Sequence, residues 1–170
     1  MPSTLSTLGI AHTLISLVPM AAGLFAFARH GRITAQDTPG RIYLLGLTLS
    51  VLTSFGLSST GGLNPGHALG VLALIAAFST LLVPRLTWLG RLRPYLAAFG
   101  PSFSFFLLLI PGTVETLKRL PAAHPLATGP EDPLVGKALL TLLIVFVAGF
   151  VVQCRAIRAN DRRGAAGQPQ

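Results

Sequence analysis

The chain has 170 residues, of which 51% are hydrophobic and only 11% charged, and its mean hydropathy is +0.67. A water-soluble domain carries about 25% charged residues, so this composition excludes an ordinary soluble domain and favours a small integral membrane protein. The net charge of +8 does not indicate a nucleic-acid partner, because the Lys and Arg residues form short clusters between long uncharged runs. A single cysteine, Cys154, excludes an internal disulfide.

The first apolar run covers residues 5–28 and contains no charge. It is long enough to cross the hydrocarbon core of a bilayer, about 30 Å, as a helix. No positive charge precedes it, and it exceeds the apolar region of a typical signal peptide. We therefore expect this run to be a retained membrane span.

The second span, residues 42–60, carries small residues four positions apart. These residues, here called the small-residue stripe, are Gly46, Ser50, Ser54 and Ser58. Small side chains at this spacing let two helix backbones approach closely in a membrane. The stripe predicts helix packing; the alternative is a hydroxyl-lined path for water, protons or a small solute.

The third span, residues 67–84, follows Gly66 and contains Gly70, which together predict a flat patch facing the small-residue stripe. A fourth span is expected over residues 95–111. Pro111 removes a backbone donor and Gly112 permits a positive φ, so this pair predicts the end of that helix.

Residues 113–133 contain four prolines and predict an irregular connector. The fifth span is expected over residues 134–154, and residues 161–170, rich in Ala, Gly and Gln, predict a disordered tail.

The basic residues predict the orientation of these spans. With the N-terminus outside, ten of the 13 Lys and Arg residues lie inside, and the outer segments hold only Lys118, Arg119 and Lys137. Such a bias is typical of the cytoplasmic side of membrane proteins. The aromatic rings of Tyr43, Trp88 and Tyr95 are expected at the inner membrane interface. The ten inner residues are Arg29, Arg32, Arg41, Arg85, Arg91, Arg93, Arg155, Arg158, Arg162 and Arg163.

No ionisable residue lies at the centre of a span, which disfavours pumps and ion-coupled transporters. Polar chemistry gathers near the outer ends, with His12 in the first span and His67 at the start of the third. Two imidazoles from different helices are the axial ligands of some haems; with Glu115 or His124 they would instead form part of a metal site. Neither has a specific motif, and a histidine that caps a helix is the simpler interpretation.

Several short motifs carry a family resemblance over residues 38–155. They are Gly40-Arg41-Ile42-Tyr43, Ser54-Phe55-Gly56, Gly61-Gly62, Gly66-His67-Ala68-Leu69-Gly70, Ile110-Pro111-Gly112, Glu115-Thr116-Leu117 and Arg119-Leu120-Pro121. The chain resembles bacterial predicted membrane proteins of the domain-of-unknown-function type. That family often carries a His-Arg pair where this chain has Gln36-Asp37. Its loose similarity to four-helix b-type cytochromes implies haem or quinone chemistry.

The sequence as a whole predicts an all-α bundle of five transmembrane helices in one domain, residues 1–160, N-terminus out and C-terminus in, in a bacterial inner membrane. We expect an accessory, helix-packing component without a cofactor or catalytic residues. Its expected partners are the lipid bilayer and a second copy or another membrane protein. The alternatives are a redox protein that binds haem b or a quinone through His12 and His67, and a small-solute permease.

Overall fold

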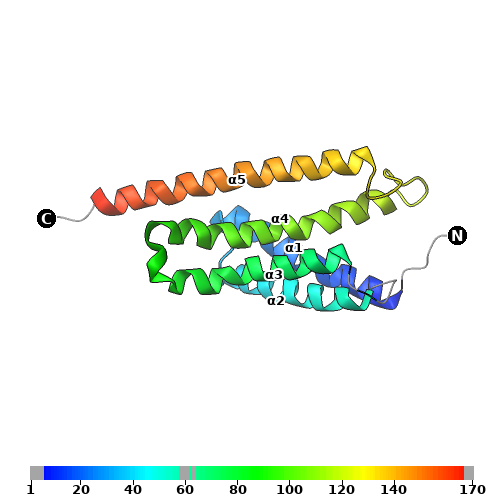
Figure 1. Cartoon of the computed structure of the whole chain (residues 1–170), viewed down its shortest axis with the longest axis horizontal. Coiled ribbons are helices and arrows are strands. Elements are labelled where there is room, and N and C mark those ends of the chain that lie inside the picture. The colour runs from blue at the N-terminus through cyan, green and yellow to red at the C-terminus, as the bar shows by residue number, and fades with distance from the viewer. Residues whose placement is uncertain (1–5, 58–61, 63, 167–170) are drawn as a thin grey trace.

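The computed structural model describes residues 6–57, 62 and 64–166, and all regular structure in these residues is helical (Figure 1). Five helices among the described residues are long and apolar enough to span a membrane, which confirms the predicted all-α class. The long helices are α1 (Thr7–His30), α2 (Thr38–Ser54), α3 (Pro65–Leu82), α4 (Arg93–Arg119) and α5 (Pro133–Ala166). Three 3₁₀ turns, η1 (Phe55–Leu57), η2 (Val83–Arg85) and η3 (Thr87–Leu92), lie between them.

Each of the first three helices is capped at its N-terminus by a polar side chain, which directly precedes the helix in the sequence. Ser6 Oγ accepts a hydrogen bond from the Gly9 N–H at 3.1 Å, and Asp37 Oδ1 accepts one from the Gly40 N–H at 2.8 Å. Such caps satisfy N–H groups that have no partner within the helix. At the other end of α1, Gly31 adopts the left-handed conformation, φ 69°, that closes helices at low cost in glycine.

The first four helices form one bundle, and α5 lies outside it. Helix α1 packs along α2, α3 packs along α4, and contacts of α2 with α3 and of α1 with α4 join the two pairs. Helix α5 packs against α4 at the edge of the bundle (Figure 1). The buried core contains Tyr43 and Leu47 from α2, Ala77 from α3 and Phe105 from α4.

Glycines allow the closest approaches between these helices. A Cβ atom on Gly100 in α4 would overlap Ser79 Oγ and would lie 2.6 Å from the Ala76 carbonyl oxygen, both in α3. A Cβ atom on Gly46 in α2 would lie 2.8 Å from Pro19 Cδ in α1. Backbones this close make dispersion contacts that larger side chains would prevent.

Helix α4 does not end at Pro111-Gly112, so the predicted end of the fourth span is wrong. The helix continues through Pro111 to Arg119, and the irregular connector is confined to residues 120–132. A membrane helix tolerates an internal proline, because ending the helix would leave many backbone groups unpaired where no water can reach them.

The fifth helix is also longer than predicted. It continues past 154 to Ala166, so residues 161–166 of the predicted disordered tail are helical, whereas 167–170 lie outside the described residues. Helix α5 continues past the arginines at its end, because Arg and Ala both have a high helix propensity.

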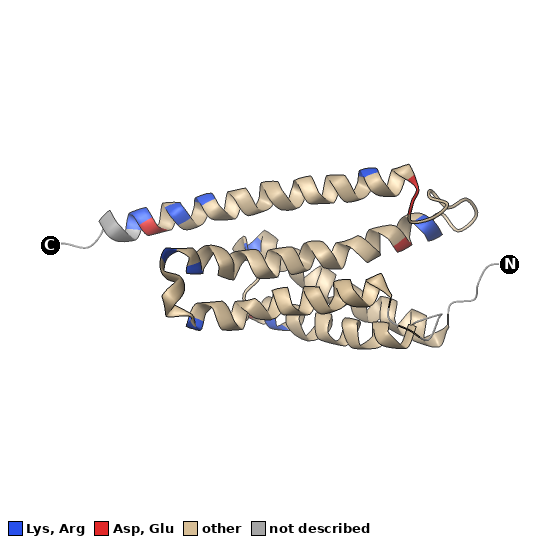
Figure 2. Cartoon of the chain, in the orientation of Figure 1, with Lys and Arg blue, Asp and Glu red and all other residues tan. Residues whose placement is uncertain are grey.

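Charged residues lie at the two ends of the molecule. Most Lys and Arg side chains lie toward the end that holds the α3–α4 connector and the end of α5 (Figure 2). Tyr43 was expected at the interface on this side, but the structure buries its side chain completely. Tyr43 can be buried because its hydroxyl forms a hydrogen bond with the buried hydroxyl of Ser104 in α4.

Candidate functional site

The strongest concentration of polar contacts between helices joins α1 to α2. His12 Nδ1 lies 2.9 Å from Thr53 Oγ1, and Ser16 Oγ lies 2.6 Å from Ser50 Oγ. Ser16 Oγ is also 3.4 Å from His12 Nε2, so the four side chains form one connected polar cluster, here called the α1–α2 polar cluster. Its members are half-buried except Ser50, which is buried.

The hydroxyl geometry assigns the His12 tautomer. Thr53 Oγ1 lies 2.9 Å from the Leu49 carbonyl oxygen and 3.0 Å from that of Ser50, so its single proton is donated to the backbone of its own helix. Thr53 Oγ1 therefore accepts a hydrogen bond from His12 Nδ1–H. Ser16 Oγ donates its proton to the His12 carbonyl oxygen at 2.8 Å. His12 Nε2 is therefore an unprotonated nitrogen that lies 3.4 Å from Ser16 Oγ.

His67 joins α3 to α2 through a second set of hydrogen bonds. Its Nδ1 accepts from the Asn64 N–H at 3.1 Å, while Asn64 Oδ1 accepts from the His67 N–H at 3.2 Å. This reciprocal pair is a capping box. Because Nδ1 accepts, Nε2 carries the proton and donates to the Ser54 carbonyl oxygen at 3.1 Å. The ring also stacks on Phe55 with a centroid separation of 4.7 Å.

The two candidate histidines thus contact adjacent residues of α2, Thr53 and Ser54, near the end of that helix. This arrangement does not fit axial haem ligation, because iron needs a ring nitrogen with a free lone pair. His67 offers its only lone pair to the α3 cap, and its other nitrogen is protonated. No group of three or more His, Cys, Asp and Glu side chains among the described residues is placed to hold a metal ion.

The small-residue stripe contacts two different helices. Gly46 and Ser50 face Pro19 and Ser16 of α1. The Ser54 carbonyl oxygen accepts from His67 of α3, whereas the Ser54 hydroxyl donates to the Val51 carbonyl oxygen of its own helix.

The other packing candidates differ in what they contact. A Cβ atom on Gly70 would lie 3.2 Å from the Val51 side chain of α2. A Cβ atom on Gly66 would meet only Asn64 of its own cap, at 3.0 Å. Ser58 lies outside the described residues. The residues of the stripe that the structure describes are therefore in contact within the chain.

Sequence reasoning missed a further polar junction between helices, at Gln153. Gln153 Nε2 in α5 donates to the Gly31 carbonyl oxygen at the end of α1, at 2.7 Å. Gln153 Oε1 lies 3.0 Å from Ser102 Oγ in α4, so one side chain bonds to both of its neighbours. This junction could have been predicted from the sequence, because Gln153 is a single amide side chain in an apolar span, and such side chains form hydrogen bonds with neighbouring helices.

The polar residues predicted at the opposite end form local contacts. Glu115 accepts from Arg119 Nε at 2.7 Å and from Lys118 Nζ at 3.3 Å within α4. Asp132, just before α5, accepts from the Thr128 and Leu134 backbone N–H groups, which lower the pKa of its carboxyl group. These carboxylates therefore stabilise a helix end and a loop.

In the part of the chain that the structure describes, five apolar helices are long enough to cross a bilayer and have polar side chains paired between them, as in a multi-pass α-helical membrane protein. No buried side-chain nitrogen or oxygen among the described residues lacks a hydrogen-bond partner. Comparisons with protein-family models, curated proteins and solved structures found no match. The resemblance to the bacterial membrane family therefore stays a prediction.

Proposed function

We propose that this protein is an accessory component of a membrane assembly, which contacts its neighbour through α5. The observation that carries this proposal is the unequal burial of the helices. The most apolar 18-residue stretch of α5 has a mean hydropathy of 2.5, higher than the corresponding stretch of the other four helices, yet only 6% of it is buried within the chain. A long helix that adds little to its own bundle is available for contact with another membrane protein.

The polar contacts inside the bundle support the same role. The α1–α2 polar cluster, the His67 cap and the Tyr43–Ser104 pair each use their hydrogen-bonding groups on a neighbouring helix. Interhelical hydrogen bonds of this kind stabilise packing where water is absent. They leave the described stripe residues occupied within the chain, so a partner would meet a different surface.

The face of α5 that points away from α4 has a pattern suited to helix contact. One side of α5 packs against α4 through Phe146 and Phe150, whose ring centroids lie 5.2–6.0 Å from those of phenylalanines in α4. On the opposite side, exposed residues recur at alternating spacings of three and four. They are Thr141, Ile144, Ala148 and Val151. This spacing, with small and branched residues in turn, is typical of left-handed helix packing.

We further propose that α1 begins outside and α5 ends inside a bacterial inner membrane. Ten of the 13 Lys and Arg residues would then lie on the cytoplasmic side. Exposed Trp88, in the α3–α4 connector, would lie at the inner interface, where amphipathic rings settle.

Site-specific photo-crosslinking in native membranes tests the accessory role. A photo-reactive residue at Ile144 should give an adduct with a second copy of this chain or with another membrane protein, distinguished by mass spectrometry. The matched control is the same residue at Ile75 in α3, since the two isoleucines are similarly exposed, at 60% and 67%. Equal adduct yields at both positions would show that α5 has no preferred partner and would overturn the proposal.

A further inference from the structure

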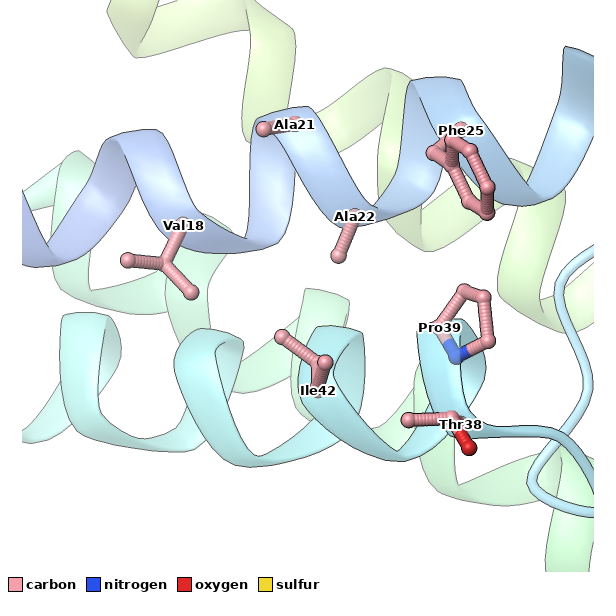
Figure 3. Close-up of a pocket in the computed structure, with 7 residues that line it drawn as sticks. All are labelled: Val18, Ala21, Ala22, Phe25, Thr38, Pro39 and Ile42. Carbon is pink, nitrogen blue, oxygen red and sulfur yellow. The ribbon is translucent and has the colours of Figure 1, made fainter.

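An apolar groove lies between α1 and α2 near the connector that joins them. Its cavity volume is about 600 Å³. Figure 3 shows Val18, Ala22 and Phe25 of α1 directed toward Pro39 and Ile42 of α2 across the gap. The lining residues are Val18, Ala21, Ala22, Phe25, Thr38, Pro39 and Ile42.

The shape of the groove follows from the order of large and small residues on α1. Ala21 and Ala22 lie between the bulkier Val18 and Phe25, so the helix surface is hollowed over that stretch. Val18 and Phe25 are seven residues apart, which corresponds to about 10 Å along a helix. The groove therefore extends about 10 Å along α1, which is the length of part of an acyl chain.

The groove opens outward from the bundle. Phe25 is 58% exposed and Ile42 is 43% exposed. In a membrane-spanning helix, exposed apolar side chains face lipid, since the surrounding solvent is hydrocarbon. An acyl chain is therefore the molecule that this surface meets.

Positive charge marks the connector end of the groove. Arg29 is one helical turn beyond Phe25 and on the same face of α1, and Arg41 directly precedes Ile42 in α2; both side chains are exposed. Arg41 Nε donates to the Ala35 carbonyl oxygen at 3.2 Å, which uses one of the five guanidinium N–H groups.

The carboxylate of this connector has partners of its own. Asp37 Oδ1 caps α2 by accepting from the Gly40 N–H, and Oδ2 lies 3.9 Å from His30 Nε2. With Arg32 included, three arginines oppose this one acid over residues 29–41. The end of the groove is therefore suited to an anion.

We propose that this groove binds an anionic phospholipid of the leaflet on the arginine-rich side. One acyl chain lies along Ala21 and Ala22, and the phosphate contacts Arg29 and Arg41. Arginine donors match phosphate oxygens well, and basic pockets between membrane helices bind anionic headgroups. Charge alone would attract any anion, but the apolar groove selects one that carries a hydrocarbon chain. This inference needs only the membrane fold and does not depend on the accessory role.

Native mass spectrometry of the detergent-purified full chain tests the proposal. The probes are phosphatidylglycerol and phosphatidylcholine with identical acyl chains, added at equal concentrations. Each arginine beside a headgroup raises the affinity for the anionic lipid about fivefold. We therefore expect preferential retention of phosphatidylglycerol, and no displacement by excess inorganic phosphate. Equal retention of the two lipids by the unaltered protein would overturn the proposal.

Two variants separate the roles of charge and groove. Arg29→Gln should lower retention of phosphatidylglycerol about fivefold, whereas Arg32→Gln, which removes the same charge three residues further along the chain, should not. Ala21→Leu should fill the groove and lower retention of both lipids; Ala11→Leu, on an exposed part of α1 outside the groove, is its control. Equal effects of Arg29→Gln and Arg32→Gln would show general charge attraction and contradict a specific site. Arg29 is exposed, so that comparison does not depend on the folding of Ala21→Leu.

Discussion

The imidazole of His67 at the start of α3 donates a hydrogen bond from Nε2 to the carbonyl oxygen of Ser54 at the end of α2, at 3.1 Å. The same ring caps its own helix through Nδ1 and is buried. One side chain therefore joins two consecutive membrane helices on either side of their connector.

Replacing His67 should destabilise this junction. His67→Ala removes the cap and leaves the Ser54 carbonyl oxygen without its partner, so we expect a loss of about 1–3 kcal/mol of unfolding free energy. Thermal unfolding in detergent, followed by circular dichroism, measures it. His124→Ala, in the exposed connector, is the control and should leave the midpoint unchanged. Equal midpoints for both variants would contradict a structural role for His67.

The His67→Ala variant also tests the haem alternative. Because both nitrogens of His67 have hydrogen-bond partners, we expect absorption spectra of the unaltered protein and His67→Ala, expressed with ample haem, to be the same. A Soret band that disappears only in His67→Ala would show iron ligation and contradict our assignment of the ring.

A methyl group at Gly100 should disrupt the contact between α3 and α4. In Gly100→Ala the new Cβ atom would overlap Ser79 Oγ and the Ala76 carbonyl oxygen. We expect a cost of about 1–3 kcal/mol in unfolding free energy, as for other overpacked sites. Gly149→Ala in α5 is the matched control, because its Cβ atom would have no neighbour within 4 Å. The unfolding free energies of Gly100→Ala and Gly149→Ala are compared by denaturant titration in detergent.

Removal of Ser79 Oγ should rescue Gly100→Ala only in part. Ser79→Ala removes the overlap with Ser79 Oγ, but the Ala76 carbonyl oxygen, 2.6 Å from the new Cβ atom, belongs to the backbone and stays in place. Full recovery in the double variant would show that the backbones can separate without cost.

Gln153 should control how firmly the end of α5 is held. Gln153→Leu keeps a similar volume but removes the hydrogen bonds to Gly31 and Ser102, at a cost of about 1 kcal/mol. We expect faster amide exchange in α5 near this residue, measured by mass spectrometry. Asn160→Leu, on the exposed part of the same helix, is the control. If the two variants exchange alike, Gln153 does not hold the helix.

The loop before α5 should respond to acid through Asp132. The N–H groups of Thr128 and Leu134 stabilise the carboxylate and lower its pKa in the folded protein. A lowered folded pKa means that the contacts are fully present above the ordinary carboxyl pKa, about 4, and are lost as the pH falls through the lower folded value. Amide exchange at Thr128 and Leu134, corrected for intrinsic rates, should therefore accelerate only in strong acid. Asp132→Asn should abolish this dependence, and its persistence there would assign the effect to another group.

The membrane class and the number of spans could be predicted from the sequence, because hydropathy over some 20 residues reports directly on the solvent of a helix. Helix ends were harder to predict. Pro111-Gly112 would end a helix in water, but α4 continues to Arg119, since a proline costs less in a membrane than a row of unpaired backbone groups.

The partners of the polar side chains depended on the tertiary structure. The spacing of Gly46, Ser50 and Ser54 along one helix predicted close packing, but which neighbour meets each residue follows only from the arrangement of α1 and α3 around α2. His12 and His67 were both placed near the outer ends of their helices; their hydrogen bonds to adjacent parts of α2 come from helix pairing. Tyr43–Ser104 and Gln153–Gly31 join residues 61 and 122 positions apart. Periodicity within one helix shows which face is polar, but the identity of the helix that covers that face is decided by packing across the whole chain.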